Sequence, residues 1–120
     1  MKKLLLTSLL IMCIGVIYGQ HDVKGIDCNK FYVENFDTIS VKGIIWSKEV
    51  TDNYYLFSVK CDNGEDKYIR LLKNVKTSQI YNFASWGSDI LKVGGERNLH
   101  IRVKYLDGSM QGKIFKDFCD

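Results

Sequence analysis

The sequence predicts an all-β protein with one short helix, in which five antiparallel strands form a small barrel. Two observations indicate this class. Short runs alternate apolar and polar residues, as half-buried strands do, and residues typical of turns separate these runs. The chain also has no proline, low-complexity segment or internal repeat, which favours a single domain without linkers.

The first 19 residues predict a cleavable export signal. Lys2 and Lys3 precede a mostly apolar run from Leu4 to Ile17, and Gly19 is a small residue suited to the cleavage site. The run is shorter than the ~20 apolar residues that a membrane-spanning helix needs, so we expect no transmembrane segment after cleavage. A glutamine would then begin the mature chain, which resembles the habit of some Gram-negative bacteria. We therefore expect the protein in the periplasm or outside a Gram-negative cell.

The mature chain would run over residues 20–120 and carry almost no net charge. Removing the two lysines of the signal leaves 15 basic residues against 14 acidic residues. Such a balance does not favour a nucleic-acid or membrane-surface partner. We expect residues 20–37 to form a partly packed N-terminal extension and residues 38–120 to form the barrel domain.

The segment 54–72 predicts a hairpin around a glycine turn. A two-residue loop and a three-residue loop are both conceivable, and they differ by one residue in register. The three-residue loop 62–64 places Gly64 in a left-handed position and buries one continuous apolar face, so we favour it. Its pairs are Phe57 with Ile69 and Tyr55 with Leu71. The face so formed holds Tyr55, Phe57, Val59, Cys61, Ile69 and Leu71.

Three more strands are expected. Residues 38–50 alternate around Gly43, and a glycine inside a strand suggests a bulge or sharp bend there. Residues 99–105 show the cleanest alternation in the chain, and residues 112–118 return after the turn that begins at Asp107.

One short helix is expected between the third and fourth strands, within residues 77–86. Thr77 or Ser78 is suited to its N-cap, and Ile80 lies on its apolar side. Gly87 is suited to the left-handed residue that ends it.

The order strand, strand, strand, helix, strand, strand resembles the OB-fold over residues 38–118. The matching features are VKGII with its internal glycine, the 54–72 hairpin, the 77–86 helix, and LKVGG leading into LHIRVKY. The resemblance implies a small barrel that binds oligomeric ligands on the face of its second and third strands.

The outward positions of the expected strands carry aromatic rings beside cations, a combination that binds flat rings, sugars or bases. The candidate ligand-binding residues are Trp46, Tyr54, Tyr68, Arg70, Arg102 and Lys104. We expect a non-enzymatic binding module for a glycan, peptide or protein in the cell envelope. Of this set, Trp46, Tyr68, Arg70 and Arg102 are the leading candidates.

Three cysteines remain after signal removal, so one disulfide and one free thiol are expected in an oxidising compartment. Cys119 is expected in the disulfide, and its partner is either Cys61 or Cys28. Either bridge would close a long loop worth on the order of 4 kcal/mol, so chain entropy does not choose between them. No C-x-x-C pair is present, and we expect neither a metal site nor a cofactor.

A second resemblance concerns the alternative function. VKCDNGEDKYIRL together with Cys119 is similar to the lysozyme-inhibitor barrels of the bacterial envelope, although their Ser-Gly-x-x-Tyr segment is missing here. This resemblance implies a disulfide between Cys61 and Cys119. It also implies a periplasmic inhibitor or immunity protein that blocks a hydrolase such as lysozyme.

Enzymatic activity is not expected. The histidines are His21, near the mature N-terminus, and His100, which alternates with Arg102 and Lys104 on the outer face of a strand. Neither has a nucleophile and an orienting acid in an evident cluster. The acidic residues of the 62–66 turn lack the alternating ligands of an EF-hand loop.

Overall fold

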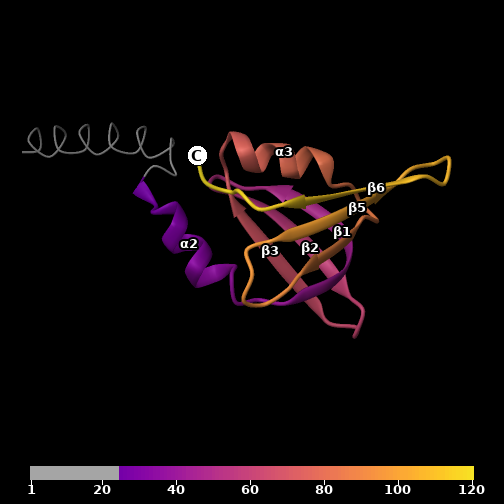
Figure 1. Cartoon of the computed structure of the whole chain (residues 1–120), viewed down its shortest axis with the longest axis horizontal. Coiled ribbons are helices and arrows are strands. Elements are labelled where there is room, and N and C mark those ends of the chain that lie inside the picture. Colours follow the sequence, from indigo (N-terminus) through magenta and orange to yellow (C-terminus); the bar gives the residue numbers. More distant parts are fainter. Residues whose placement is uncertain (1–24) are drawn as a thin grey trace, which may run out of the picture.

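The computed structural model describes residues 25–120, and the expected export signal lies outside them. Six antiparallel strands form one sheet in the order β3-β2-β1-β4-β5-β6. The strands are β1 (Val41–Val50), β2 (Tyr54–Cys61), β3 (Asp66–Leu72), β4 (Asp89–Lys92), β5 (Leu99–Lys104) and β6 (Met110–Phe115). The helices are α2 (Cys28–Asn35) and α3 (Val75–Phe83). Figure 1 shows α3 against the sheet, α2 near the C-terminus, and the β5–β6 hairpin reaching beyond the other strands.

The all-β class is confirmed, but the barrel is not. The sheet begins at β3 and ends at β6, and no pairing joins these two edges, so the sheet is unclosed. Five strands were expected, and residues 25–120 contain six. The additional strand is β4, which pairs with both β1 and β5. The last strand is β6, which ends at Phe115 rather than at residue 118.

The predicted register of the β2–β3 hairpin is confirmed. Phe57 lies opposite Ile69, and Tyr55 lies opposite Leu71. Gly64 has φ +91°, the left-handed conformation that a three-residue loop requires. The face that these strands turn inward is buried, apart from the half-buried Tyr55.

The irregularity predicted at Gly43 lies three residues further along β1. The pairing with β2 shifts between Ile45 and Ser47, which leaves Trp46 as the extra residue of a bulge. Gly43 itself is in regular register, and a Cβ there would lie 2.1 Å from the carbonyl oxygen of Lys60. This glycine is therefore required by the close approach of two strands rather than by a bend.

Helix α3 begins two residues earlier than expected. Its N-cap is Asn74, whose side chain accepts a hydrogen bond from the Thr77 amide at 2.9 Å. The Thr77 hydroxyl in turn accepts one from the Asn74 amide at 3.0 Å. Neither Thr77 nor Ser78 is the cap. The asparagine takes the position because this reciprocal arrangement satisfies two amides at once.

The C-terminal end of α3 is held by a side chain of β1. The ammonium group of Lys48 donates hydrogen bonds to the carbonyl oxygens of Tyr81 (2.7 Å) and Ala84 (2.8 Å). A cation at this end also complements the helix dipole. Burial lowers the pKa of Lys48.

Residues 28–35 form a helix that the sequence did not predict. Asp27 caps α2 by accepting a hydrogen bond from the Lys30 amide at 3.1 Å. Phe31, Tyr32 and the following Phe36 are buried in the same hydrophobic core as the sheet. The segment 25–37 thus contributes to the core.

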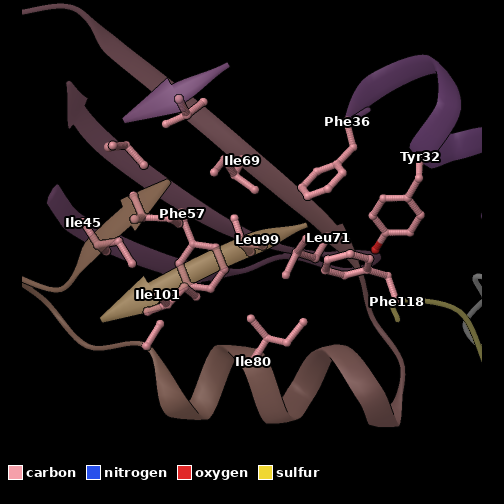
Figure 2. Close-up of a cluster of buried hydrophobic side chains, with 14 of the residues drawn as sticks. Tyr32, Phe36, Ile45, Phe57, Ile69, Leu71, Ile80, Leu99, Ile101 and Phe118 are labelled. Atoms are coloured by element: carbon pink, nitrogen blue, oxygen red, sulfur yellow. The ribbon is translucent and has the colours of Figure 1, made fainter. Parts of the chain in front are cut away.

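Figure 2 shows that α3 contributes to one end of the core, and α2 and the C-terminal tail contribute to the other end. Ile80 of α3 points toward Phe57 of β2, and both are fully buried. At the other end, the ring of Phe118 lies 5.2 Å from that of Tyr32 and 5.1 Å from that of Phe36. These aromatic contacts join α2 to the C-terminal tail.

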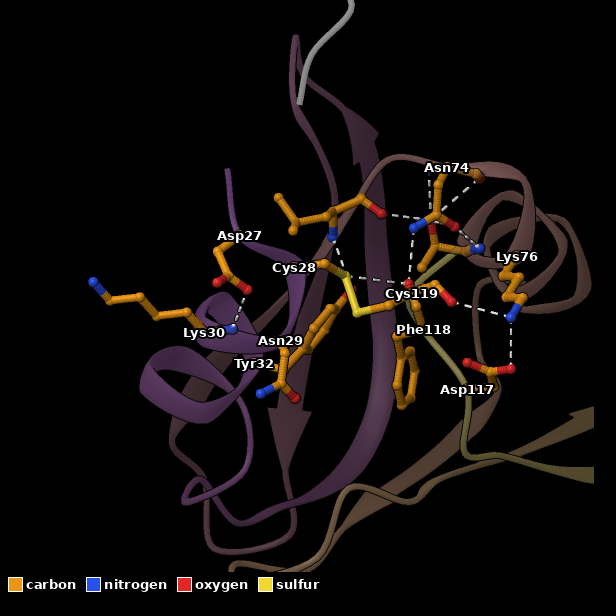
Figure 3. The surroundings of a disulfide bond; sticks show 12 residues. Asp27, Cys28, Asn29, Lys30, Tyr32, Asn74, Lys76, Asp117, Phe118 and Cys119 are labelled. Carbon is orange, nitrogen blue, oxygen red and sulfur yellow. Dashed lines mark hydrogen bonds and ion pairs between the residues drawn. A yellow bond between two sulfur atoms is a disulfide. The ribbon is translucent and has the colours of Figure 1, made fainter. Parts of the chain in front are cut away.

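The disulfide joins Cys28 to Cys119 (Figure 3). The predicted disulfide of Cys119 is thus confirmed, and of its two predicted partners Cys28 forms the bridge while Cys61 does not. Cys61 is a free thiol that faces the core and is 7% exposed, whereas the tail turns away from the sheet after β6 and meets the first turn of α2. Hydrogen bonds also hold the tail: Nδ2 of the Asn74 side chain donates to the Phe118 carbonyl (2.8 Å), and the Lys76 ammonium donates to the Cys119 carbonyl (3.0 Å).

A bidentate ion pair ties the end of the α2 segment to the β4–β5 connection. The guanidinium of Arg97 donates to both carboxylate oxygens of Asp37 at 2.8 and 2.7 Å. This hydrogen bonding lowers the pKa of Asp37. Nearby, the buried ammonium of Lys92 donates to three backbone carbonyls, which compensates the loss of its hydration.

Candidate functional site

A groove of about 610 Å³ lies on the outer face of β1, β4, β5 and β6. We call it the outer-face groove. Its lining residues are Lys42, Gly43, Asp62, Asp89, Ile90, Leu91, His100, Ile101, Arg102, Gly112, Lys113 and Ile114. Its volume lies in the range of about 300–1,000 Å³ that is typical of ligand sites.

The strand register sets two rows of side chains across this groove. In the first row, Lys42 lies opposite Leu91, Leu91 opposite His100, and His100 opposite Ile114. In the second row, Asp89 lies opposite Arg102, and Arg102 lies opposite Gly112. Directly opposite residues are cross-strand neighbours, so each row is a continuous surface.

An ion-pair cluster forms the polar centre of the second row. Asp89 accepts hydrogen bonds from Nε (3.0 Å) and Nη2 (2.6 Å) of Arg102, and the ammonium of Lys104 lies 3.5 Å away. The hydrogen bonds from Arg102 are the main cause of a lowered pKa of Asp89. Both cations remain about half exposed, with side-chain exposures of 56% for Arg102 and 49% for Lys104. One carboxylate thus holds two cations that still face solvent.

The side of the groove along β6 is open because one residue has no side chain. A Cβ added at Gly112 would have the Ile101 carbonyl oxygen as its nearest neighbour, at 3.9 Å. On either side along the strand, Met110 and Ile114 are 55% and 54% exposed. A ligand group entering from this side therefore meets an unobstructed path to Arg102, bordered by two apolar side chains.

The six residues predicted from the sequence fall into separate groups. Arg102 and Lys104 lie together at Asp89, as described above. At the far end of the sheet, the guanidinium of Arg70 lies 5.2 Å from the ring centre of Tyr54. Tyr54 also stacks on Phe31 of α2, at 5.5 Å between ring centres, so this ring contributes to packing.

The two other predicted residues remain on the surface. Trp46 is 51% exposed, and the ammonium of Lys60 lies 5.9 Å from its ring centre. Tyr68 is 58% exposed. Neither ring lines the outer-face groove. Within residues 25–37, α2 packs against Tyr54 and leaves Trp46 and Tyr68 exposed.

Several groove residues were not predicted. Asp89 and Leu91 lie on β4, a strand of four residues that is too short for an alternation pattern to identify. Gly112 and Ile114 lie within the predicted last strand, but only the pairing with β5 places them next to Arg102 and His100. The sequence signal was the alternation of residues 99–105, which identified His100 and Arg102 as outward-facing residues of β5.

No helix within residues 25–120 is both long and apolar enough to cross a lipid bilayer. Comparison with protein-family models, with curated proteins and with solved structures finds no match to this chain. The site is therefore interpreted from its own geometry.

Proposed function

We propose that this protein is an exported, non-enzymatic binding protein, and that its outer-face groove receives a peptide segment of a partner protein in the cell envelope. The observation that carries the proposal is the groove itself, in which Asp89 holds the half-exposed guanidinium of Arg102 between apolar residues, while the ammonium of Lys104 lies beside the same carboxylate. A few fixed polar groups in a mostly apolar hollow are typical of sites that orient a ligand.

Peptide is favoured over glycan by the kind of residue in the groove. Sugar sites use aromatic rings as platforms, and the exposed rings of Trp46 and Tyr68 lie outside the groove. The groove instead offers aliphatic surface from Leu91 and Ile114 beside a cation at Arg102. This combination suits alternating apolar and acidic side chains.

The inhibitor alternative is weakened because one feature that its resemblance implied is absent. The resemblance to lysozyme inhibitors implied a bridge from Cys61 to Cys119, whereas the disulfide is Cys28–Cys119. We also propose that the sheet is OB-like and that the chain is exported. A disulfide is compatible with an oxidising compartment outside the cytoplasm.

The proposal is tested by selecting peptides from a phage-displayed random dodecapeptide library. Gly112→Trp should fill the groove, and Gln79→Trp places the same side chain on an exposed position of α3 as the matched control. We expect the selected peptides to bind wild type and Gln79→Trp alike, and to lose at least tenfold in affinity for Gly112→Trp. Peptides that bind all three proteins equally would show that the groove is not the site.

A pair of alanine variants then separates the groove from the aromatic surface. Arg102→Ala should weaken the selected peptides by about tenfold, as loss of one charged contact does, while Arg70→Ala should leave their affinity unchanged. Both residues are exposed, so both melting temperatures should stay within a few degrees of wild type. The reverse order of affinities would move the site to the surface around Tyr54.

A further inference from the structure

The backbone of β6 has a free side, and its residues follow from the hairpin turn. The Tyr105 amide donates to the Ser109 carbonyl at 2.8 Å, so these two residues form a hydrogen-bonded pair. Opposite pairs in an antiparallel ladder alternate between bonded and non-bonded. Counting along β6, residues 111, 113 and 115 bond to β5. The residues whose N–H and C=O groups point away from β5 are Met110, Gly112 and Ile114.

The β2–β3 hairpin shows the same alternation. The Cys61 amide donates to the Glu65 carbonyl at 2.8 Å, and the alternation from this pair turns the Leu72 amide away from β2. This amide indeed donates to the Tyr32 hydroxyl of α2, at 3.0 Å. The edge of β3 is thus capped at this position by a helix.

The edge of β6 has no such cap. Within residues 25–120, no hydrogen bond engages the outward backbone groups of Met110, Gly112 or Ile114. An uncapped edge strand is a template for another strand, and recognition by strand addition uses this property. The side chains of Met110 and Ile114 lie on the outer face, and Gly112 and Ile114 line the groove.

We propose that an extended acidic peptide pairs with β6 as a seventh strand and places alternate side chains over the outer-face groove. This inference deepens the proposed function and rests on it. Apolar residues of the peptide would lie beside Met110 and Ile114. A glutamate between them would lie opposite Gly112 and extend across it toward Arg102.

The geometry and charge of the site support this arrangement. Strands are about 4.8 Å apart, so a residue on the added strand is roughly 10 Å from Arg102 at the backbone. A glutamate and an arginine side chain can together span this distance once the guanidinium turns from Asp89 of β4 toward β6. The Gly112 position between them holds no side chain. Arg102 and Lys104 border the path on the outer face, with Asp89 as the acidic residue between them, so an acidic group is electrostatically complementary.

The probe is the synthetic peptide acetyl-Thr-Ile-Thr-Glu-Thr-Ile-Thr-amide, added to the full mature protein and followed by residue-resolved amide hydrogen exchange. At saturation, we expect exchange of the Gly112 and Ile114 amides to slow at least tenfold. The amides of residues 111 and 113, already bonded to β5, should change little. A peptide with lysine in place of glutamate should bind at least tenfold more weakly, and Arg102→Ala should abolish this difference.

Backbone-modified probes and a matched pair of variants test the pairing itself. N-methylation of one alternate set of peptide amides should abolish binding, whereas methylation of the other set should not. Ile114→Pro removes an outward N–H without removing a bond to β5, and Ile114→Ala keeps that N–H. We expect the alanine variant to weaken binding only through the lost apolar contact, and the proline variant to abolish binding. If it fails to fold, the methylated peptides carry the same comparison.

Three outcomes would overturn strand addition. Peptide binding that shifts groove resonances without protecting Gly112 and Ile114 would place the ligand across the face, and the proposed function would stand. No binding at millimolar peptide would refute the inference, while the phage selection decides the proposed function separately. Concentration-dependent protection of these amides without peptide would assign the edge to a second copy of the chain.

Discussion

The β2–β3 and β5–β6 hairpins are closed by the same turn but have different surroundings. Each has a three-residue loop that ends in a left-handed glycine, with φ +91° at Gly64 and φ +92° at Gly108. In each, the amide before the loop donates to the carbonyl after it at 2.8 Å. In each, the side chain before the glycine accepts a hydrogen bond from the amide after it, Asn63 from Glu65 and Asp107 from Ser109.

The strands that leave these turns differ in what covers them. Ile69 and Leu71 of β3 are fully buried, and α2 caps the edge at Leu72. Along β6, residues 110–114 are exposed, and Phe115 is the one half-buried residue. Turn chemistry therefore fixes register in both hairpins, whereas burial is decided by segments distant in the sequence. The second hairpin is the more exposed of the two.

The largest effect is expected from removing the disulfide that holds α2, the helix that caps the edge of β3. The Cys28→Ser/Cys119→Ser variant should lose about 4–5 kcal/mol of unfolding free energy by chain entropy, since the bridge spans 91 residues. Urea unfolding with and without reductant measures it, and the variant itself should be insensitive to reductant. Wild type that is equally stable in reductant would contradict this role of the bridge.

The next effect compares the same substitution at a buried position of β3 and at an exposed position of β6. Ile69→Ala deletes a fully buried side chain and should cost about 2–5 kcal/mol. Ile114→Ala makes the same change at a side chain that is 54% exposed and should cost less than about 0.5 kcal/mol. Chemical denaturation of both variants gives the comparison, and similar losses would mean that β6 is covered in solution.

A smaller effect is expected at the capped edge. Tyr32→Phe removes the hydroxyl that accepts from the Leu72 amide and leaves this amide without its partner. We expect a loss of about 1–3 kcal/mol, because a buried donor becomes unsatisfied. Exchange of the Leu72 amide should accelerate beyond the change in global stability. An unchanged Leu72 amide would show that the hydroxyl does not protect it.

The smallest and most equal effects are expected at the turns. Gly64→Ala and Gly108→Ala each force an L side chain into the left-handed region and should each cost about 1–2 kcal/mol. Gly25→Ala, where a Cβ meets nothing within 4 Å, is the control and should be near neutral. Thermal or urea unfolding measures the loss of stability in each variant. Clearly unequal losses at the two turns would contradict the view that they are the same type of turn.

These elements also show what the sequence can predict. The register of the first hairpin was predictable because loop chemistry and the burial of Phe57 and Ile69 agree. Helix α2 was not, because it is stabilised by distant partners such as Phe118 and Cys119. The bulge at Trp46 likewise depends on how β1 pairs with β2.

The groove was predictable only in part, for the same reason. Alternation on β5 identified Arg102 and Lys104 as outward residues. Their partner Asp89 lies on a strand too short to recognise from the sequence. Gly112 can be recognised as a groove residue only because the strand pairing places it opposite Arg102. Side-chain direction is local information, whereas the neighbours across a sheet are set by pairing between segments.

The most direct test of the free edge is amide hydrogen exchange on the protein without ligand. We predict rapid exchange at Gly112 and Ile114, and slow exchange at Gln111 and Lys113, which bond to β5. The Leu72 amide on the opposite edge should be slow as well. Exchange at Gly112 and Ile114 as slow as at Lys113 would mean that the edge is already occupied, and would contradict strand addition at β6.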